Sequence, residues 1–334
     1  MKQKILIIAE AGVNHNGNLS NALKMVNIAA KAKADFIKFQ TFSPESLSQK
    51  KMNLANYQKT NTSFLDQLNM LRKYSLTLDD FKKIKLRCNK KKIKFMTSPF
   101  DEESLQIVKK LNPEYVKIAS GEITNIPLLR SIGKLNKKVI MSTGMSNFEE
   151  ICSAIKVLVK SGLRKEKISI LHCSTEYPAS IKKLNLMSVK YLREKLKIRV
   201  GYSDHSLGIE ASIIALSFGA KILEKHFTLN KKMRGPDHTS SLSPAELNDY
   251  IKKIRLFEHS IGKYEKKPYK SELKNLNIVR KQIVAKKKII IGQKFSRSNI
   301  TTKRAKKGIP ASKWDKVIGQ KSKFNFQQDE NIKI

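Results

Sequence analysis

Polar residues that could do chemistry stand at the ends of short apolar runs in this 334-residue chain. An apolar run that closes on a polar residue and opens a loop is typical of a buried strand leading into a site. In a barrel of eight alternating strands and helices, the carboxyl ends of all strands converge on one mouth, where such side chains can act together on a small molecule. The pattern therefore predicts an enzyme. The polar residues at the ends of the apolar runs are Glu10, Lys38, Ser98, Lys117, Ser142, Ser174, Ser203, Glu224 and His226.

Two histidines form the strongest pair among these positions. His205 and His226 follow the seventh and eighth predicted strands, which are neighbours in a barrel. Two imidazoles from adjacent strand ends can bind one divalent metal and leave positions open for substrate. We therefore predict a metal site at His205 and His226, with Glu10, Asp204 and Asp237 within reach as further ligands, as residues that orient the ligands, or as acceptors for substrate hydroxyls. The alternative is that both histidines are structural.

Two lysines interrupt otherwise apolar strands, Lys38 in FIKFQ and Lys117 in YVKIAS. A buried ammonium group is costly unless it meets an anion, so we expect both to face a ligand or a carboxylate. They could form a Schiff base with a carbonyl substrate, or clamp a phosphate or carboxylate as fixed charges. The motifs SGE at 120–122 and STG at 142–144 favour the clamp, because small residues beside glycine let backbone N–H groups approach phosphate oxygens.

The segments between these positions carry apolar residues at helical spacing, for example Ala22, Met25 and Ala29. Strands that alternate with helices imply parallel pairing, and the size predicts a (β/α)8 TIM barrel over residues 1–261. No GxGxxG motif follows the first strand, which removes the main support for a dinucleotide-binding fold. Residues 44–74 are expected to lie over the mouth. The apolar runs are Ile5–Ala9, Phe36–Phe39, Ile93–Thr97, Tyr115–Ala119, Lys138–Met141, Ile168–Cys173, Ile198–Tyr202 and Ile222–Glu224.

A second domain is expected after the barrel. Residues 262–279 are charge-rich and poor in apolar residues, and they contain Gly262 and Pro268, as is typical of a linker. Residues 280–334 have short β-type segments with turns. They hold 16 Lys and Arg against 3 Asp and Glu, which places +13 of the total charge of +39 there. We predict a small β-rich domain with little core of its own.

The charge of +39 makes nonspecific nucleic-acid binding by a basic, nonenzymatic protein an alternative function. The lysines are spread over every segment, however, and runs such as residues 90–92 have no interleaved aromatic residues. We expect no specific nucleic-acid partner. No run approaches the roughly 20 apolar residues of a membrane span, and the first strand begins too early for a signal peptide, so we expect a cytoplasmic protein. Cys88, Cys152 and Cys173 lack CxxC spacing and are expected to be free thiols.

Nine ordered motifs run through the predicted barrel: IAEAGVNHNG (8–17), IKFQTF (37–42), SPFD (98–101), SGE (120–122), STGM (142–145), HCSTEYP (172–178), YSDHS (202–206), EKHFTL (224–229) and GPDH (235–238). Three more follow in the tail: TKR (302–304), GI (308–309) and WDKVIG (314–319). Together they resemble the bacterial sialic acid (N-acetylneuraminate) synthase family. The tail motifs are similar to that family's C-terminal antifreeze-like (SAF) domain, so the resemblance covers nearly the whole chain.

This resemblance implies condensation of phosphoenolpyruvate with an N-acetylmannosamine-type sugar, which gives a nine-carbon 2-keto-3-deoxy acid and phosphate. Relatives that make legionaminic or pseudaminic acid share the framework, so a related amino sugar is the alternative acceptor; a Schiff-base lyase is a further alternative. The resemblance also implies that His205 and His226 hold a divalent metal, usually Mn²⁺, with Mg²⁺ or Co²⁺ as alternatives. It further implies a domain-swapped homodimer, in which Arg304 of one subunit completes the mouth of the other.

The same resemblance assigns substrate contacts. Phosphoenolpyruvate would be held by Lys38, Lys117, Ser120, Ser142 and Ser203. The sugar and the reacting carbons would be surrounded by Glu10, Gln40, Ser98, Glu122, Thr175, Tyr177 and Asp237. The chain departs from the family at Thr175, where some members have Asn, and at residues 305–307, where Ala-Lys-Lys stands in place of the usual Pro-Gly-Asn. His15 and His172 belong to the motifs and are expected to make structural hydrogen bonds.

Overall fold

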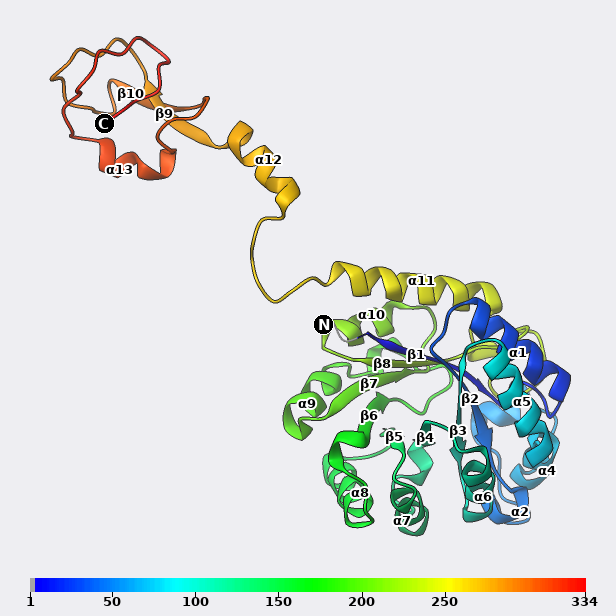
Figure 1. The fold of residues 1–334 in the computed structure, drawn as a ribbon. Coiled ribbons are helices and arrows are strands. Elements are labelled where there is room, and N and C mark those ends of the chain that lie inside the picture. Colours follow the sequence, from blue (N-terminus) through cyan, green and yellow to red (C-terminus); the bar gives the residue numbers. More distant parts are fainter. Residues whose placement is uncertain (1–3) are drawn as a thin grey trace. The chain divides into compact units, whose positions relative to one another are not determined.

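The first eight strands pair side by side into a closed parallel barrel in the computed structural model, which describes residues 4–334 (Figure 1). The last strand, β8 (Ile222–His226), closes the ring on β1 (Leu6–Gly12), with Glu10 opposite His226. The predicted TIM barrel is confirmed. The other strands are β2 (Phe36–Thr41), β3 (Lys94–Pro99), β4 (Tyr115–Ile118), β5 (Lys138–Ser142), β6 (Ile168–Cys173) and β7 (Arg199–Asp204).

Several strands extend beyond the apolar runs that predicted them. β7 reaches Asp204 and β8 reaches His226, whereas the runs ended at Tyr202 and Glu224. Ladder hydrogen bonds are made by the backbone, and they continue for as long as the neighbouring strand is in register, whatever the side chain. Ser203 and His226 therefore belong to the strands themselves, which hold them more rigidly than loops would, and His205 follows directly after β7.

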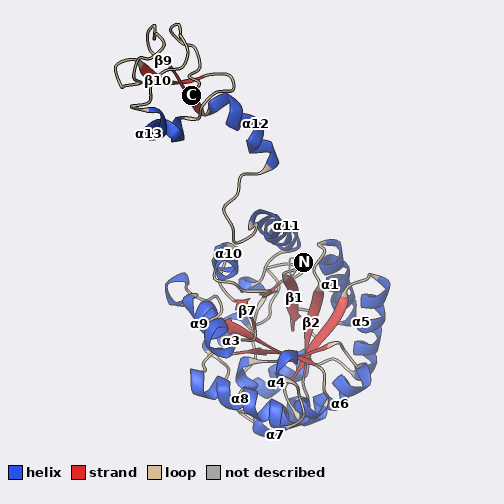
Figure 2. Ribbon diagram, turned by 60° about the vertical axis from the view of Figure 1, so that its left-hand side comes forward, coloured by secondary structure: helices blue, strands red, loops and turns tan. Residues whose placement is uncertain are grey.

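Helices form a layer around the barrel, and Figure 2 shows them outside the ring of strands. Local sequence starts several of them: the Thr77 and Asn147 side chains cap α5 and α8, each within a capping box. Among the described residues, none of the helices is both long and apolar enough to cross a membrane. The helices of this unit are α1 (Leu19–Lys31), α2 (Pro44–Leu47), α3 (Asn56–Asn61), α4 (Gln67–Tyr74), α5 (Leu78–Lys90), α6 (Glu102–Leu111), α7 (Ile126–Lys134), α8 (Phe148–Lys160), α9 (Met187–Leu196), α10 (Glu210–Ser217) and α11 (Pro244–Ser260).

Residues 44–74 fold into the three short helices α2, α3 and α4 over the mouth, as expected. They have a small apolar cluster of their own, in which Leu54 and Met70 pack with Val13 and Phe42 from the barrel loops. Asn61 ties the segment to the loop after β8, because its backbone oxygen accepts a hydrogen bond from Gly235 and its side chain donates to the carbonyl of residue 236.

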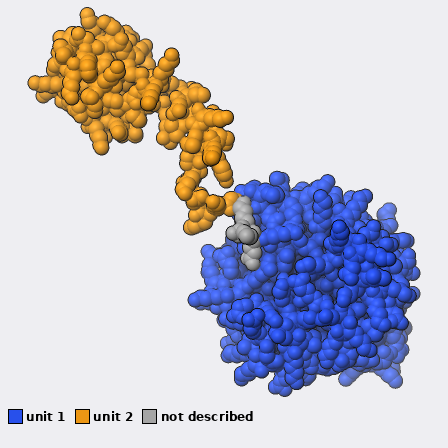
Figure 3. Space-filling model, in the orientation of Figure 1, with its two compact units in different colours: residues 1–261 blue, residues 262–334 orange. Residues whose placement is uncertain are grey.

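A second compact unit comprises Gly262–Ile334 (Figure 3). Residues 262–279, predicted as a linker, contain the helix α12 (Lys270–Val279), which buries no residue. The unit also holds an antiparallel pair, β9 (Lys281–Ala285) and β10 (Ile300–Arg304), and the short helix α13 (Trp314–Val317). The prediction of little core needs correction: eight apolar side chains are buried together. They are Ile283, Ala285, Ile289, Phe295, Ile300, Val317, Phe326 and Ile332.

Candidate active site

A cavity of about 370 Å³ opens at the mouth of the barrel, a volume suited to a small molecule. Inward-facing residues at the ends of the strands line it, together with the loops that follow them and with residues 44–74. The structure thus brings most of the predicted site residues together. Those that line the cavity are Gln40, Lys117, Ser120, Ser142, Thr175, Tyr177, Ser203, His205, His226 and Asp237.

Two lysines and two glutamates form a buried cluster of charge at this cavity. Lys38 Nζ lies 3.0 Å from a carboxylate oxygen of Glu10 and 3.6 Å from one of Glu224. Lys117 Nζ lies 3.8 Å from Glu224 and donates a 2.6 Å hydrogen bond to Ser142 Oγ. All four charged side chains are at most 5% exposed. Each buried lysine therefore meets a carboxylate, which offsets part of the cost of burying its charge.

Burial and charge oppose each other within this cluster. Burial disfavours the ammonium form of Lys38, but Glu10 and Glu224 outweigh it and raise the pKa of Lys38. For Lys117 burial prevails and lowers the pKa. Burial raises the pKa of Glu10 to about 8 against the pull of Lys38, whereas the two lysines outweigh burial and lower the pKa of Glu224. Glu10 is therefore the carboxyl group of the cluster that can exchange a proton near neutral pH.

The two predicted metal ligands lie next to each other, with ring centroids 5.4 Å apart. His205 Nδ1 donates a 2.5 Å hydrogen bond to the carbonyl oxygen of Ser174, so its Nε2 carries the lone pair. His226 Nδ1 is buried without a hydrogen-bond partner among the described residues, and a carboxylate oxygen of Asp237 lies 3.9 Å away. Burial lowers the pKa of His205 to about 4 and that of His226 well below its ordinary value, so both rings are neutral at neutral pH.

These observations fit the predicted divalent metal. Neutral imidazoles are common ligands of such ions. The unpartnered Nδ1 of His226 is one candidate ligand, and the Nε2 of His205, which accepts from the Tyr177 hydroxyl at 3.2 Å, is the other once that hydroxyl turns away. In residues 4–334, no three His, Cys, Asp or Glu side chains converge on one point. Substrate or water would thus complete the coordination of a metal held by the two histidines. Gly12 leaves room beside this site: it has a φ of +52°, and a Cβ there would lie 3.3 Å from a Glu10 carboxylate oxygen.

Asp204 does not face the metal site, contrary to the prediction. Successive residues of a strand point to opposite sides, and because Ser203 and His205 face the cavity, Asp204 points outward. There its carboxylate pairs with Lys225 at 2.8 Å and accepts a hydrogen bond from Ser212 at 2.7 Å. Asp237, from the loop after β8, does place a carboxylate near His226.

Some predicted residues do not line the cavity. Glu10 and Lys38 contribute through the charge cluster. Ser98 is fully buried in β3, and its Oγ has no partner among the described residues. Glu122, in the short 3₁₀-helix η1 (Ser120–Glu122), accepts a 2.8 Å hydrogen bond from the N-cap residue of α7. Arg304 ends β10 in the second unit, where it is exposed.

Among the other residues that line the cavity, Glu224 and Tyr57 had no predicted contact with substrate or metal. Glu224 joins the two lysines, and the signal for it was an acidic residue at the end of an apolar run. Tyr57, in α3, stacks on Tyr177 with 5.0 Å between ring centroids, and Tyr177 stacks on His205 at 4.2 Å. No periodic pattern marked Tyr57, because it lies in the irregular segment over the mouth.

The remaining motif histidines make structural hydrogen bonds, as expected. His15 Nδ1 accepts from the backbone N–H of Gly17 at 3.0 Å. His172 Nε2 bonds the carbonyl oxygen of Leu184 at 2.7 Å, and a carbonyl can only accept, so this nitrogen carries the proton. The three cysteines are free; Cys173 is buried and lines the cavity beside Ser120.

The chain is similar to a known protein family along most of its length. The model of the NeuB family matches residues 25–266. The N,N'-diacetyllegionaminic acid synthase of Campylobacter jejuni is 47% identical over 332 residues, which is 99% of both chains. The enzyme of the same name from Legionella pneumophila is 36% identical and covers 96% of this chain and 91% of its own length.

Among solved structures, the N-acetylneuraminic acid (sialic acid) synthetase of Leptospira borgpetersenii, in complex with citrate, superposes with a TM-score of 0.72. It is 33% identical, over 82% of this chain and 91% of its own. The relatives are synthases, they match almost end to end, and the family model spans most of the barrel. This chain is therefore an enzyme that belongs to the NeuB family.

Proposed function

We propose that this enzyme is an N,N'-diacetyllegionaminate synthase, which condenses phosphoenolpyruvate with an amino sugar that carries two acetamido groups. The observation that carries this proposal is the 47% identity to the Campylobacter synthase of that name across both whole chains, against 33% to the N-acetylneuraminic acid synthetase of known structure. Phosphoenolpyruvate contains no nitrogen, so both acetamido groups of such a product must come from the acceptor. N-Acetylmannosamine, the acceptor first expected from the resemblance, has only one.

The charge cluster supports the phosphoenolpyruvate end of this proposal. Lys117, Ser142 and Ser203 present an ammonium group and hydroxyls to the cavity, and such groups suit a phosphate and a carboxylate. The two lysines are already balanced by Glu10 and Glu224, so a bound trianion would leave excess negative charge. Glu10 can relieve it by taking up a proton, since burial raises its pKa to about 8.

Other residues that line the cavity suit an acetylated sugar. Gln40, Tyr177 and Asp237 supply polar groups for hydroxyls and amides. Phe42 and Met70 also line the cavity, and they pack in one apolar cluster with other residues of the segment over the mouth. Acetamido groups end in methyls, which gain from contact with such a surface. The methyl of a second acetamido group can therefore pack against these apolar residues.

The reaction joins C3 of phosphoenolpyruvate to the aldehyde carbon of the open-chain sugar. A divalent cation held by His205 and His226, Mn²⁺ by family resemblance, would supply Lewis-acid polarisation of the aldehyde oxygen. Asp237, whose pKa burial raises to about 7, can exchange a proton at a sugar oxygen. Lys117 holds the phosphate and carboxylate, with Lys38 supporting it through Glu224, so that C3 faces the aldehyde.

Water then adds at C2 and loses a proton to the phosphate group of the ester, because Glu10 is already protonated while the trianion is bound. The tetrahedral intermediate expels phosphate by cleavage of the C2–O bond, and the C2 hydroxyl becomes the ketone after losing its proton. The test is phosphoenolpyruvate labelled with ¹⁸O at the bridging oxygen, incubated with Mn²⁺ and the bis-acetamido sugar. The proposal predicts label in the released phosphate. Label in the keto acid, or no phosphate release, would overturn it.

The proposal includes a homodimer in which Arg304 of one subunit meets the sugar at the mouth of the other. A guanidinium group could bind an acetamido carbonyl and help to exclude water. Mixing inactive His226→Ala chains with inactive Arg304→Ala chains tests this, because in a swapped heterodimer one mouth receives both defects and the other receives neither. Up to about half the activity of those heterodimers should return. Subunit exchange without recovery would contradict the assignment.

A further inference from the structure

A buried ion pair lies on the outer side of the barrel wall, directly behind the two histidines. Asp204 immediately precedes His205 in the chain, and Lys225 immediately precedes His226. Asp204 and Lys225 are also register partners in the pairing of β7 with β8. Because strand residues alternate in direction, the pair points away from the cavity that the histidines line.

The pair is held by a dense set of directional contacts. Its charged atoms are 2.8 Å apart, and the side chains are 0% and 2% exposed. Lys225 Nζ also donates to the backbone oxygen of Ser206 at 2.7 Å. One oxygen of Asp204 accepts from the backbone N–H and the hydroxyl of Ser206, at 2.9 and 2.6 Å. The other accepts from Ser212 of α10, whose hydroxyl contacts Tyr250 of α11 at 2.9 Å.

These contacts join the two histidine-bearing strand ends. The turn after β7 is bound through Ser206 to Asp204 on its own strand and to Lys225 on β8. His205 lies between the two anchored residues, so its backbone position relative to His226 is set by this network. Ser212 and Tyr250 tie the same point to the helix layer.

We propose that the Asp204–Lys225 pair is a positioning device, which fixes the separation and orientation of the His205 and His226 imidazoles and thereby the affinity of the metal site. This inference rests on the proposed two-histidine metal site. A buried ion pair is often no better for stability than apolar residues of similar size, because desolvation cancels much of its attraction. Its hydrogen bonds, in contrast, are directional, and support of metal ligands from behind affects metal affinity.

The experiment compares Mn²⁺ affinity in the substrate-free full-length protein, measured from the electron paramagnetic resonance signal of free Mn²⁺. The variants are Asp204→Asn and the apolar double replacement Asp204→Leu with Lys225→Met, which leaves no buried unpaired charge. Both should weaken Mn²⁺ binding by about 10-fold or more and lower kcat more than they raise the KM for phosphoenolpyruvate. The double variant should keep a melting temperature near that of the wild type.

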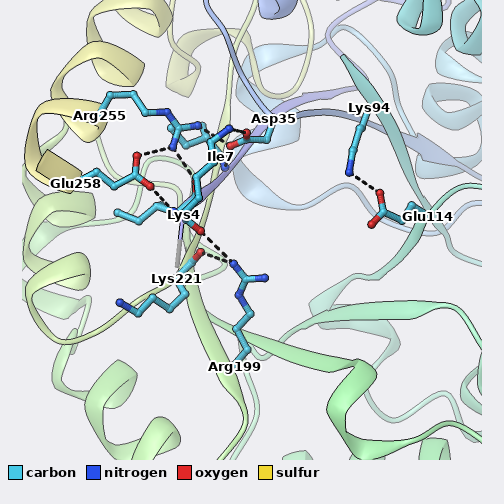
Figure 4. A network of polar contacts seen from close by, with 10 residues as sticks. Lys4, Ile7, Asp35, Lys94, Glu114, Arg199, Lys221, Arg255 and Glu258 are labelled. Atoms are coloured by element: carbon cyan, nitrogen blue, oxygen red, sulfur yellow. Dashed lines mark hydrogen bonds and ion pairs between the residues drawn. The ribbon is translucent and has the colours of Figure 1, made fainter. Parts of the chain in front are cut away.

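The matched control is Asp35→Asn, which removes a partner of Arg255 at the opposite end of the barrel (Figure 4). It should leave Mn²⁺ affinity unchanged. If the double variant folds and binds Mn²⁺ as tightly as the wild type, the positioning role is wrong. If instead the wild type binds Mn²⁺ no better than His226→Ala, the metal site itself is wrong, and the positioning role is overturned with it.

Discussion

The two ends of the barrel use charged residues in opposite ways. At the amino end, Asp35 pairs with Arg255 at 2.6 Å and accepts a hydrogen bond from the backbone of Ile7, while Arg255 also bonds Glu258 and the carbonyl of Ile5 (Figure 4). These charges join α11 to β1, and they are only partly buried. These side chains bond the backbone and one another, and so they stabilise the fold.

At the mouth, the charges are more deeply buried and less well satisfied. Glu10 Oε1, Ser98 Oγ and His226 Nδ1 are buried without a hydrogen-bond partner among the described residues. Such groups cost stability, and at the mouth a bound metal or substrate would complete them. The difference indicates that polar residues at the amino end stabilise the barrel, whereas those at the mouth are arranged for substrate and metal.

The largest predicted effect is the loss of activity in His226→Ala. Removing one of two metal ligands should lower kcat/KM by about 10³-fold or more, because several kcal/mol of transition-state stabilisation depend on the metal. The melting temperature should stay within a few degrees of the wild type, since His226 Nδ1 makes no hydrogen bond within residues 4–334. Full activity of the variant after exhaustive chelation would show that catalysis needs neither the metal nor His226.

A smaller effect is expected for Lys117→Arg. The variant keeps the charge but not the point-like geometry of the ammonium group, so turnover should persist with the KM for phosphoenolpyruvate raised about 10-fold or more. The KM for the sugar should change little. An arginine cannot form an imine, so borohydride inactivation of the wild type only in the presence of substrate would favour a Schiff base and contradict the clamp.

At the amino end, Asp35→Asn should affect stability rather than chemistry. It removes the charge that meets Arg255 and Lys4 and should lower the free energy of unfolding by about 2 kcal/mol. Chemical denaturation measures the loss, and kcat/KM should stay within about twofold of the wild type. A large fall in activity without a fall in stability would remove the contrast between the two ends.

The smallest effect concerns Tyr57, an uncharged part of the mouth. Tyr57→Ala removes the outer ring of the stack on Tyr177 and should raise the KM for the sugar about 5- to 10-fold, the range expected for an aromatic contact. The KM for phosphoenolpyruvate should not change. Tyr57→Phe, which keeps the stack, is the control; if both variants behave alike, the stacked ring does not contact the sugar.

The sequence predicted the barrel and most of the mouth, because apolar runs mark strands and the barrel fold brings their ends together. It placed Asp204 wrongly because the predicted seventh strand stopped at Tyr202; extended to Asp204, the two-residue alternation would have turned that side chain outward. Tyr57 gave no signal, since it lies in a segment without periodicity. The core around Ile289 and Phe326 was also missed, because residues far apart in the chain meet there without a repeating pattern.

One measurement tests the central claim most directly: a competition between two acceptors for the mouth. Equal concentrations of the bis-acetamido sugar and N-acetylmannosamine are incubated with the enzyme, Mn²⁺ and limiting phosphoenolpyruvate, and the two products are separated by mass. Their ratio equals the ratio of the two kcat/KM values. We predict at least about 10-fold more N,N'-diacetyllegionaminate, since burial of an additional methyl-bearing group is worth about 1–3 kcal/mol. A product that is mainly N-acetylneuraminate would contradict the proposed function.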